Sequence, residues 1–325
     1  MKVFACRNIN EDVRVNSSSG GIFSVFAESI LEEKGIIYGV AMTEECYSAE
    51  YIRVTSLKDL SRLRGSKYLQ AKMGDTYQKV RHDLLGGKKV LFTGTGCQVN
   101  GLKGFLQREY ENLICMDVIC HGTPSIALWK KYVLHQEKKY GKLQTVNFRC
   151  KDDSWINFGM KENELYISKD SDAYMQMFLR NYSLRPSCYN CIAKKKKMAD
   201  ITIADFWGIE NIAPELNDDK GTSLMLLRTE KGEQFFEKIR GNMIVRKVEY
   251  EDAVKYNPSE YESVEKPDLR TEFYTDMNNL SFEELTKKYV APMKISLTIR
   301  VKGKLKRIIK TFDSNIKEKI SGRKI

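Results

Sequence analysis

Apolar residues follow alternating strand and helix spacings through the first 140 residues. Short apolar runs at 36–40, 51–54, 89–93 and 112–120 predict buried strands. Between and after these runs, apolar residues at helical spacing predict helices at 22–30, 57–64 and 76–85, another beginning beside Cys97, and one that ends near residue 140. Strands that alternate with helices in this way favour an α/β sheet with parallel neighbours.

The pattern changes after residue 140. Residues 146–168 predict two or three short strands, 201–204 and 224–227 predict further core strands, and 231–240 predicts a helix. We therefore expect an α/β fold that becomes α+β in its second half, with a mixed sheet flanked by helices. The expected domains are a catalytic domain at 1–241 and a helical extension with a basic tail at 242–325.

The basic charge is concentrated near the carboxyl terminus. The chain has 325 residues and a net charge of +11, but residues 294–325 contain eleven Lys or Arg against two acidic residues. The remaining residues carry about +2, which argues against nucleic-acid binding by the main domain. Apolar residues interleave with the basic ones from Ile295 to Ile309, so this segment could lie on an anionic membrane surface or dock on the domain.

The compartment follows from the cysteines and from the lack of targeting signals. No run of 18 apolar residues predicts a membrane-spanning helix, and residues 1–6 lack the apolar core of a secretory signal. Eight cysteines in such a chain indicate reduced thiols and not a disulfide framework. We expect a cytoplasmic protein, with peripheral contact at the inner face of the membrane if the tail binds lipid.

The pair Cys188-x-x-Cys191 gives the strongest signal for chemistry. Two thiolates at this spacing supply half of a four-ligand site, and the other half must come from elsewhere. Cys97, in Thr93-Gly-Thr-Gly-Cys97-Gln98, and Cys120, in Ile119-Cys120-His121-Gly122, both follow a predicted strand. Cysteine spacing alone leaves zinc and a 4Fe–4S cluster equally open. We interpret the other four cysteines as non-ligands: Cys6, Cys46, Cys115 and Cys150.

Neighbouring residues each have a functional and a structural interpretation. A thiol at Cys97 would lie at a helix amino terminus, which favours thiolate, although a small residue at a tight turn explains it as well. Gly94 and Gly96 could hold a phosphate there. His121, one of three histidines, could donate a proton, bind metal or be structural. The run at 194–197 could bind an acidic partner, but such runs are more often solvated loops.

Taken together, these motifs resemble the family of beta subunits of coenzyme F-420 hydrogenases and dehydrogenases. The resemblance extends over about residues 3–290 and preserves the order of six motifs: Ser17-Ser-Ser-Gly-Gly-Ile-Phe23, Arg64-Gly-Ser-Lys-Tyr68, Val90-Leu-Phe-Thr-Gly-Thr-Gly-Cys-Gln98 with Gly101-Leu-Lys103, Asp117-Val-Ile-Cys-His-Gly122, Arg185-Pro-Ser-Cys-Tyr-Asn-Cys191 and Ala199-Asp-Ile-Thr-Ile-Ala-Asp-Phe-Trp-Gly208. The family's Gly-x-Pro-Cys turn is Gly94-Thr-Gly96-Cys97 here, which loosens the turn and keeps the thiol.

The resemblance implies an iron–sulfur flavoprotein that passes electrons between a 4Fe–4S cluster, FAD and a hydride acceptor. It makes Cys97, Cys120, Cys188 and Cys191 the cluster ligands. Lys67 becomes a candidate for stabilising the anionic reduced flavin, and His121 a candidate proton donor. The candidate FAD-binding residues are Ser18, Ser19, Gly20, Gly21, Ser66, Lys67, Tyr68, Gly94, Thr95 and Gln98.

Many relatives also carry an amino-terminal ferredoxin module, whereas only Cys6 lies in that region here. We therefore expect electrons to be exchanged with a separate ferredoxin or similar protein. The acceptor expected from the resemblance is the deazaflavin coenzyme F-420 or an intermediate of polysaccharide assembly. The alternative is a binding protein without redox activity, in which the four cysteines hold structural zinc.

Overall fold

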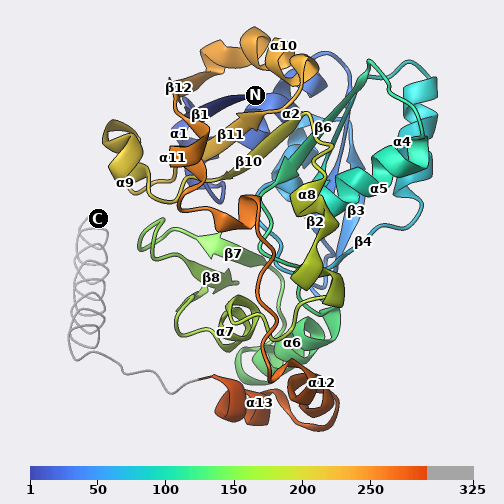
Figure 1. Cartoon of the computed structure of the whole chain (residues 1–325). Coiled ribbons are helices and arrows are strands. Elements are labelled where there is room, and N and C mark those ends of the chain that lie inside the picture. The colour runs from blue at the N-terminus through green and yellow to red at the C-terminus, as the bar shows by residue number, and fades with distance from the viewer. Residues whose placement is uncertain (291–325) are drawn as a thin grey trace, which may run out of the picture. The chain divides into compact units, whose positions relative to one another are not determined.

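A computed structural model describes residues 1–290 of the chain, which form one compact unit (Figure 1). The basic segment at 294–325, with its predicted helix and membrane contact, lies outside the described residues. Among the helices of residues 1–290, none is long and apolar enough to cross a membrane.

The core is a nine-stranded mixed sheet with the strand order β12-β1-β11-β10-β6-β5-β2-β3-β4. Its four central strands, β10, β6, β5 and β2, run parallel to one another, so their carboxyl ends meet at one edge of the sheet. The strands are β1 (Lys2–Asn8), β2 (Ile36–Met42), β3 (Ala49–Val54), β4 (Ala71–Lys72), β5 (Val90–Thr95), β6 (Leu113–Val118), β10 (Ile201–Asp205), β11 (Ser223–Leu227) and β12 (Met243–Lys247).

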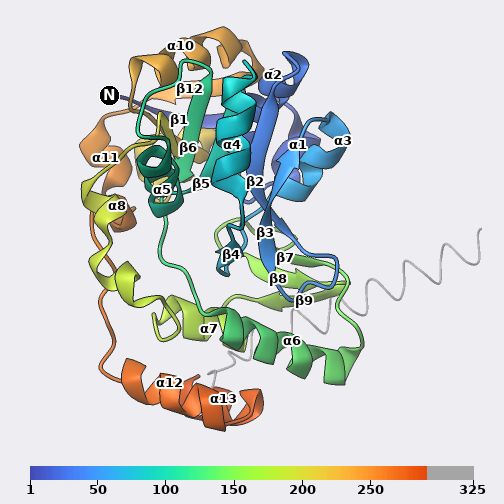
Figure 2. The ribbon, with the colours of Figure 1, turned by 90° about the vertical axis from the view of Figure 1, so that its right-hand side faces the viewer.

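Helices cover both faces of the central strands because side chains alternate along each strand. Leu91 and Ile114 pack on one face with α2 (Ile22–Glu32) and α10 (Glu230–Ile239). Phe92 and Leu113 pack on the other face, against α4 (Thr76–Leu85) and α5 (Gly96–Leu106). Figure 2 shows α4 and α5 in front of the strands. Shorter helices close the connections: α1 (Glu11–Val15), α3 (Leu57–Leu60), η1 (Ser61–Leu63), α9 (Ile209–Ile212), η3 (Pro214–Leu216) and η4 (Arg240–Asn242).

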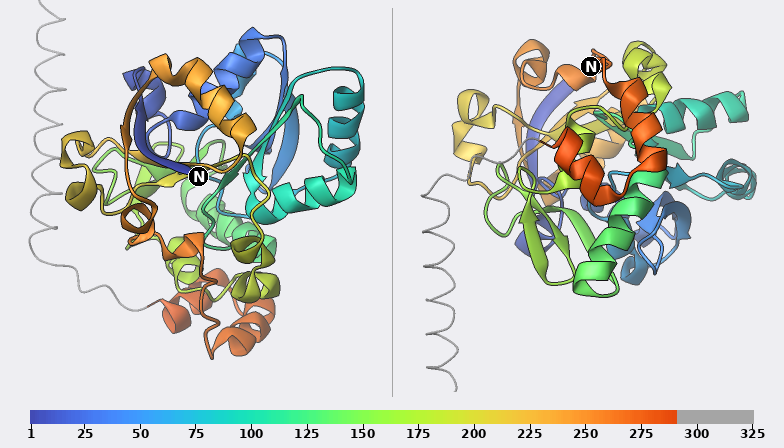
Figure 3. Two further views of the ribbon diagram at one scale, coloured as in Figure 1. Left: turned by 45° about the horizontal axis from the view of Figure 1, so that its top comes forward. Right: turned by 90° about the horizontal axis from the view of Figure 1, so that it is seen from below.

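A second layer lies beyond the carboxyl edge of the parallel strands, and the chain between β6 and β10 supplies most of it (Figures 1 and 2). It contains an antiparallel sheet of three strands, which confirms the short strands predicted at 146–168. Seen from below in Figure 3, α12 and α13 cross this layer. Its elements are α6 (Ile126–Tyr140), β7 (Val146–Cys150), β8 (Gly159–Glu162), β9 (Leu165–Ser168), α7 (Ala173–Leu179), η2 (Pro186–Asn190), α8 (Ile192–Lys195), η5 (Pro258–Glu260), α12 (Arg270–Asn279) and α13 (Phe282–Tyr289). The helix α11 (Tyr250–Val254) instead packs on β1 of the main sheet.

The structure confirms the α/β fold with a mixed sheet, and this sheet has strands at one side that the sequence patterns did not predict. Sequence patterns predicted no strand at 2–8 or 243–247, yet β1 pairs with both β11 and β12. The expected domain boundary after residue 241 therefore does not coincide with an end of the sheet. The compact unit continues to Val290.

Candidate functional site

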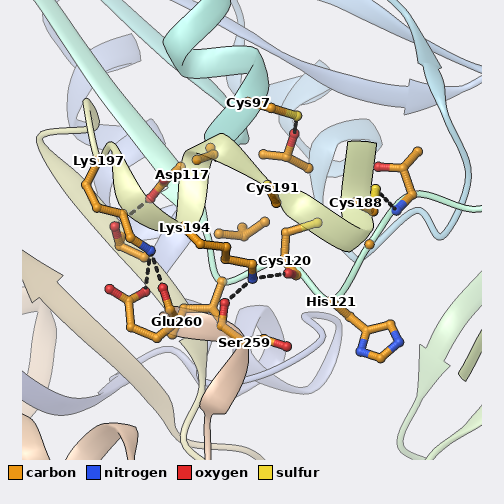
Figure 4. Close-up of a pocket in the computed structure, with 18 residues that line it drawn as sticks. Cys97, Asp117, Cys120, His121, Cys188, Cys191, Lys194, Lys197, Ser259 and Glu260 are labelled. Atoms are coloured by element: carbon orange, nitrogen blue, oxygen red, sulfur yellow. Dashed lines mark hydrogen bonds and ion pairs between the residues drawn. The ribbon is translucent and has the colours of Figure 1, made fainter. Parts of the chain in front are cut away.

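All four candidate cysteine ligands line one small pocket, which we call the thiol pocket (Figure 4). Cys97 is exposed, and Cys120, Cys188 and Cys191 are half-buried. The other four cysteines are buried elsewhere, and all eight are free thiols. The structure thus brings together three sequence segments that lie up to 94 residues apart, as expected from the sequence.

The fold explains why these thiols meet. Cys97 and Cys120 each lie two residues beyond the carboxyl end of a parallel strand, β5 and β6 respectively. Cys188 lies in η2, and Cys191 immediately precedes α8, which contacts the start of α5. Gly96 permits this contact, because a Cβ there would lie only 3.2 Å from Cβ of Ala193 and 3.0 Å from Asp117 Oδ2. Gly96 therefore brings two cysteine-bearing segments together.

Electrostatics in the thiol pocket disfavour free thiolates. The pKa of the Cys120 thiol is raised to about 12, chiefly by burial; Lys194 opposes this shift and the other three cysteines add to it. Burial likewise raises the pKa of Cys188, and the backbone N–H of Thr123, which donates to its sulfur at 3.4 Å, lowers it. Four ionised thiols would repel one another in this pocket unless a bound cation or metal centre took up their charge.

The run at 194–197 is not wholly the solvated loop that we expected from the sequence, because Lys194 and Lys197 point inward and have partners within the chain. Lys194 Nζ donates to the carbonyl of Cys120 at 2.5 Å and also to the carbonyl of Ser259. Lys197 Nζ pairs with the buried carboxylate of Glu260 at 3.1 Å. Figure 4 shows both side chains turned toward the thiol pocket. Their ammonium groups brace this wall through hydrogen bonds that sequence patterns cannot reveal.

A larger cavity of about 940 Å³ adjoins the thiol pocket. Cys97, Cys120 and His121 line both spaces, so the two share a wall. This volume lies near the upper end of the range of about 300–1,000 Å³ that is usual for small-molecule and cofactor sites. The cavity wall includes nearly all the residues predicted to hold FAD: Ser18, Ser19, Gly21, Ser66, Lys67, Tyr68, Gly94, Thr95 and Gln98.

The two predicted serine loops of this wall are joined directly. Ser18 Oγ accepts a hydrogen bond from the backbone N–H of Ser66 at 2.8 Å, across 48 residues of sequence. Lys151 holds the first loop from behind, because its Nζ donates to the carbonyl of Ser19 at 3.1 Å. Gly20 does not line the cavity; its N–H donates to Ser223 Oγ at 3.0 Å and anchors the turn to the sheet.

The turn at 94–98 is organised by Gln98. The Gln98 side-chain oxygen accepts hydrogen bonds from the Thr95 N–H at 2.8 Å and from the Tyr51 hydroxyl at 3.0 Å. A Cβ at Gly94 would lie 2.2 Å from the Tyr51 oxygen, so only glycine fits beside this pair. The α5 amino terminus is thereby fixed with its first turn directed at the shared wall.

Lys67 lines the cavity, but its ammonium group already has three partners. Its Nζ donates to the carbonyls of Arg62, Leu63 and Arg64 at 3.1, 3.0 and 2.7 Å. Burial lowers the pKa of Lys67 to about 7, whereas three acceptors favour the protonated form, which alone has three N–H donors. The Lys67 ammonium group thus caps the end of η1, and all three of its N–H donors are in use. It can therefore act on a ligand through its charge more readily than through a new hydrogen bond.

His121 lies at the boundary between the two spaces, and its ring contacts residues of the second layer. Nε2 is 2.7 Å from the side-chain oxygen of Asn181, and the ring packs edge-on against Phe178. Burial lowers the pKa of His121, and the bond to Asn181 opposes that shift. Figure 4 shows the imidazole turned away from the four thiols. His121 also lines the larger cavity.

Sequence reasoning missed a basic part of the cavity that the second layer supplies. The buried Arg149 guanidinium lies 3.7 Å from the Phe158 ring centre, and its Nη2 is 3.1 Å from an oxygen of Asp205. Trp207, in the motif at 199–208, lies on the same wall. The cavity lining contains one acidic residue, Asp205, and five basic residues: Arg64, Lys67, Arg149, Lys169 and Arg185. This balance favours an anionic ligand.

Comparisons with known proteins agree with this geometry. Residues 3–76 match the amino-terminal part, and residues 87–253 the carboxyl-terminal part, of the coenzyme F-420 hydrogenase/dehydrogenase beta subunit. The chain belongs to this family. The family resemblance inferred from the motifs is therefore confirmed.

The curated relatives are distant and longer. The chain is 22% identical over 226 residues to the coenzyme F-420-dependent sulfite reductase of Methanocaldococcus jannaschii, covering 68% of this chain and 34% of that protein. It is 22% identical over 240 residues to a subunit of the F(420)H(2) dehydrogenase of Methanosarcina mazei, covering 70% of this chain and 60% of that protein. The chain thus spans about a third and three fifths of these relatives.

A solved structure shares the fold. A chain in a xenon-derivatized structure of the F-420-reducing NiFe hydrogenase complex from Methanosarcina barkeri aligns with a TM-score of 0.56 at 15% identity. The alignment covers 89% of this chain and 90% of that chain. It supports the arrangement of the sheet and its second layer.

Proposed function

We propose that this protein is an iron–sulfur flavoprotein oxidoreductase, with a 4Fe–4S cluster in the thiol pocket and FAD in the larger cavity. The observation that carries the proposal is the wall shared by the two spaces. Cys97 and Cys120 face the thiol pocket and also line a cavity large enough for a dinucleotide. When bound, the cluster would supply single electrons and the flavin would convert them into hydride transfer.

The donor set matches the ligands of a 4Fe–4S cluster. Four soft thiols line one pocket, and such a cluster takes one thiolate at each of its four irons. A structural zinc site can also take four thiolates, so the metal content of the purified protein distinguishes the two.

The larger cavity fits an anionic dinucleotide. Ser18 and Ser66 form a polar wall at the end of the cavity nearest β1 and β11, and the α5 amino terminus at Thr95 directs backbone N–H groups toward the shared wall. Lys67 adds positive charge to the same lining. His121 lines both spaces, which supports its proposed role as proton donor.

The proposed acceptor is coenzyme F-420, which the names of both curated relatives and of the matching structure contain. The proposed electron partner is a ferredoxin-like protein. An intermediate of polysaccharide assembly is a second acceptor that we proposed from the sequence, and no feature of residues 1–290 favours it over coenzyme F-420.

The test is to purify the protein without oxygen, measure its flavin and iron, and mix it with reduced coenzyme F-420 and an oxidised viologen dye. We expect the reduced coenzyme to be oxidised by wild-type protein and not by Cys191→Ser. If flavin and iron are present and the coenzyme is not oxidised, the proposal of coenzyme F-420 as the acceptor is wrong, while the proposed cofactors are supported. If neither cofactor is present, the proposed function itself is wrong.

A further inference from the structure

The segments that carry Cys97, Cys188 and Cys191 contain no acidic residue. Residues 94–108 and 173–199 together include eight Lys or Arg and neither Asp nor Glu. The whole chain before the basic tail carries only about +2, so the rest of that stretch is net negative. Four of these eight basic residues, at 194–197, follow Cys191 closely, and Lys194 and Lys197 line the thiol pocket.

Part of this charge faces solvent without internal neutralisation. Lys195 and Lys196 are exposed, and no carboxylate of residues 1–290 forms an ion pair with either. Their position is nevertheless fixed, because the Asn100 side-chain amide donates to the carbonyl of Lys196 at 2.8 Å and ties the end of α8 to α5. A fixed, unpaired pair of lysines differs from the inward-facing Lys194 and Lys197 of the same run.

An apolar side chain lies next to these lysines. Ile192 follows Cys191 directly and is 63% exposed, although it begins α8 beside α5. Cys97, at the start of α5, is also exposed. One exposed apolar residue needs no explanation by itself. An exposed apolar residue beside an exposed thiol, with charged residues around them, matches the apolar centre and polar rim of a protein interface.

We propose that Cys97, Ile192, Lys195 and Lys196 form a docking face for an acidic electron-transfer protein. This inference rests on the proposed function, because it supplies the route by which the thiol pocket exchanges electrons. In each encounter the partner loses one electron and the centre held by the cysteines gains it, with no bond made or broken. Complexes of this kind are small, short-lived and steered by charge, so their formation depends on salt.

Binding is measured first, with an acidic 2Fe–2S ferredoxin of the plant type as the probe and surface plasmon resonance at low and high salt. The test variant is Lys195→Glu/Lys196→Glu. The matched control is Lys138→Glu/Lys139→Glu, an exposed adjacent pair at the end of α6. We expect wild type and control to bind and to lose affinity as salt rises, and the test variant to bind at least about tenfold more weakly at low salt.

The proposal is overturned if wild-type protein does not bind the ferredoxin, or if the test variant binds as wild type does. Equal weakening in the control variant also overturns it. If the test variant loses affinity for a DNA duplex and keeps its affinity for the ferredoxin, the lysines serve nucleic acid instead. Ile192→Ser is expected to weaken binding at both salt concentrations, because it removes apolar contact and no charge.

Binding does not depend on the cofactors, so the two proposals can fail separately. Iron and flavin are measured on the same samples and are expected to be equal in wild type and all three variants. Salt-dependent binding by a protein without iron or flavin would support the docking face and contradict the proposed function. Iron and flavin in a protein that does not bind the ferredoxin would support the proposed function and contradict the docking face.

Discussion

Two of the clusters of ionisable side chains in residues 1–290 differ in how their polar groups are satisfied. In the carboxylate cluster, formed by Tyr132, Gln136, Glu162 and Asp172, every member bonds another. The Tyr132 hydroxyl is 2.6 Å from Asp172 Oδ2 and also bonds Glu162, while Gln136 Nε2 donates to Glu162 at 2.7 Å. In the thiol pocket the sulfurs have only weak partners, such as the Thr95 hydroxyl at 3.2 Å from Cys97.

This difference separates a structural cluster from a ligand site. Buried polar groups that complete one another fix the packing of the elements that carry them, here α6, β8 and α7. Ligand-type side chains that converge without satisfying one another are suited to an external partner. The predictions below test this division, beginning with the largest effect.

Loss of one thiol from the thiol pocket is expected to remove the metal centre. Cys120→Ala leaves three ligands, so iron should fall from about four per chain to near zero, and the activity with it. The matched control is Cys115→Ala, on the same chain segment but buried in the core, which should keep its iron. Iron assays on the two variants, purified without oxygen, measure this difference. Full iron in Cys120→Ala would remove this residue from the ligand set.

Loss of the central hydroxyl of the carboxylate cluster is expected to cost stability without affecting iron. Tyr132→Phe leaves two buried carboxyl groups without their shared partner, so urea unfolding should show a loss of about 2–4 kcal/mol. Tyr140→Phe, an exposed residue on the same helix, should change stability by less than about 0.5 kcal/mol. Loss of iron in Tyr132→Phe at unchanged stability would contradict the separation of a structural carboxylate cluster from a ligand site in the thiol pocket.

Lys194 belongs to both classes, because its ammonium group is hydrogen-bonded within the chain and lies in the thiol pocket. Lys194→Met keeps the side-chain length and removes the charge. We expect iron to be retained and the reduction potential of the centre to fall by about 50 mV or more, because a nearby positive charge favours the reduced form. A redox titration monitored by electron paramagnetic resonance measures this. An unchanged potential would mean that Lys194 only braces the wall.

The carboxylate cluster also predicts a pH dependence of stability. One phenolic proton cannot serve two carboxylates, so one carboxyl group holds a proton. Burial raises the pKa of Asp172 to about 7, although Tyr132 and the Met175 N–H oppose the shift. The folded state therefore binds a proton that the unfolded state has lost, and stability falls as the pH rises toward and through 7.

Asp172→Asn removes this titratable group and can keep the hydrogen bonds with the Tyr132 hydroxyl and the Met175 N–H. Between pH 6 and pH 8, wild type should lose about 1 kcal/mol more than Asp172→Asn in the free energy of unfolding. Urea unfolding at the two pH values tests the difference. Identical pH dependence in both proteins would show that another group holds the proton.

The sequence predicts the thiol pocket well, for a physical reason. Strands β5 and β6 are continuous apolar runs buried on both faces, and a cysteine that follows each must lie at the shared carboxyl edge. By contrast, β12 is half-exposed at the edge of the sheet, so its residues show no clear pattern. Strand β1 was missed although residues 3–6 form a short apolar run, which is buried in the sheet.

The positions of Arg149, which lines the larger cavity, and of Lys151, which holds the loop at Ser19, could not be predicted from local sequence. Arg149 and Lys151 lie in a short hairpin strand and beyond its end, and nothing in their neighbours indicates burial. Lys151 contacts Ser19 across 132 residues, and Arg149 reaches Asp205 across 56. Such contacts depend on how the second layer lies on the first, which a periodic pattern does not specify.

The most direct test of the division is the metal and flavin content of wild-type protein purified without oxygen, with iron, sulfide, zinc and FAD measured on one sample. The account predicts about four iron and four sulfide per chain with bound FAD and no stoichiometric zinc. One zinc per chain, with neither iron nor flavin, would contradict it. The thiol pocket would then be a structural site like the carboxylate cluster.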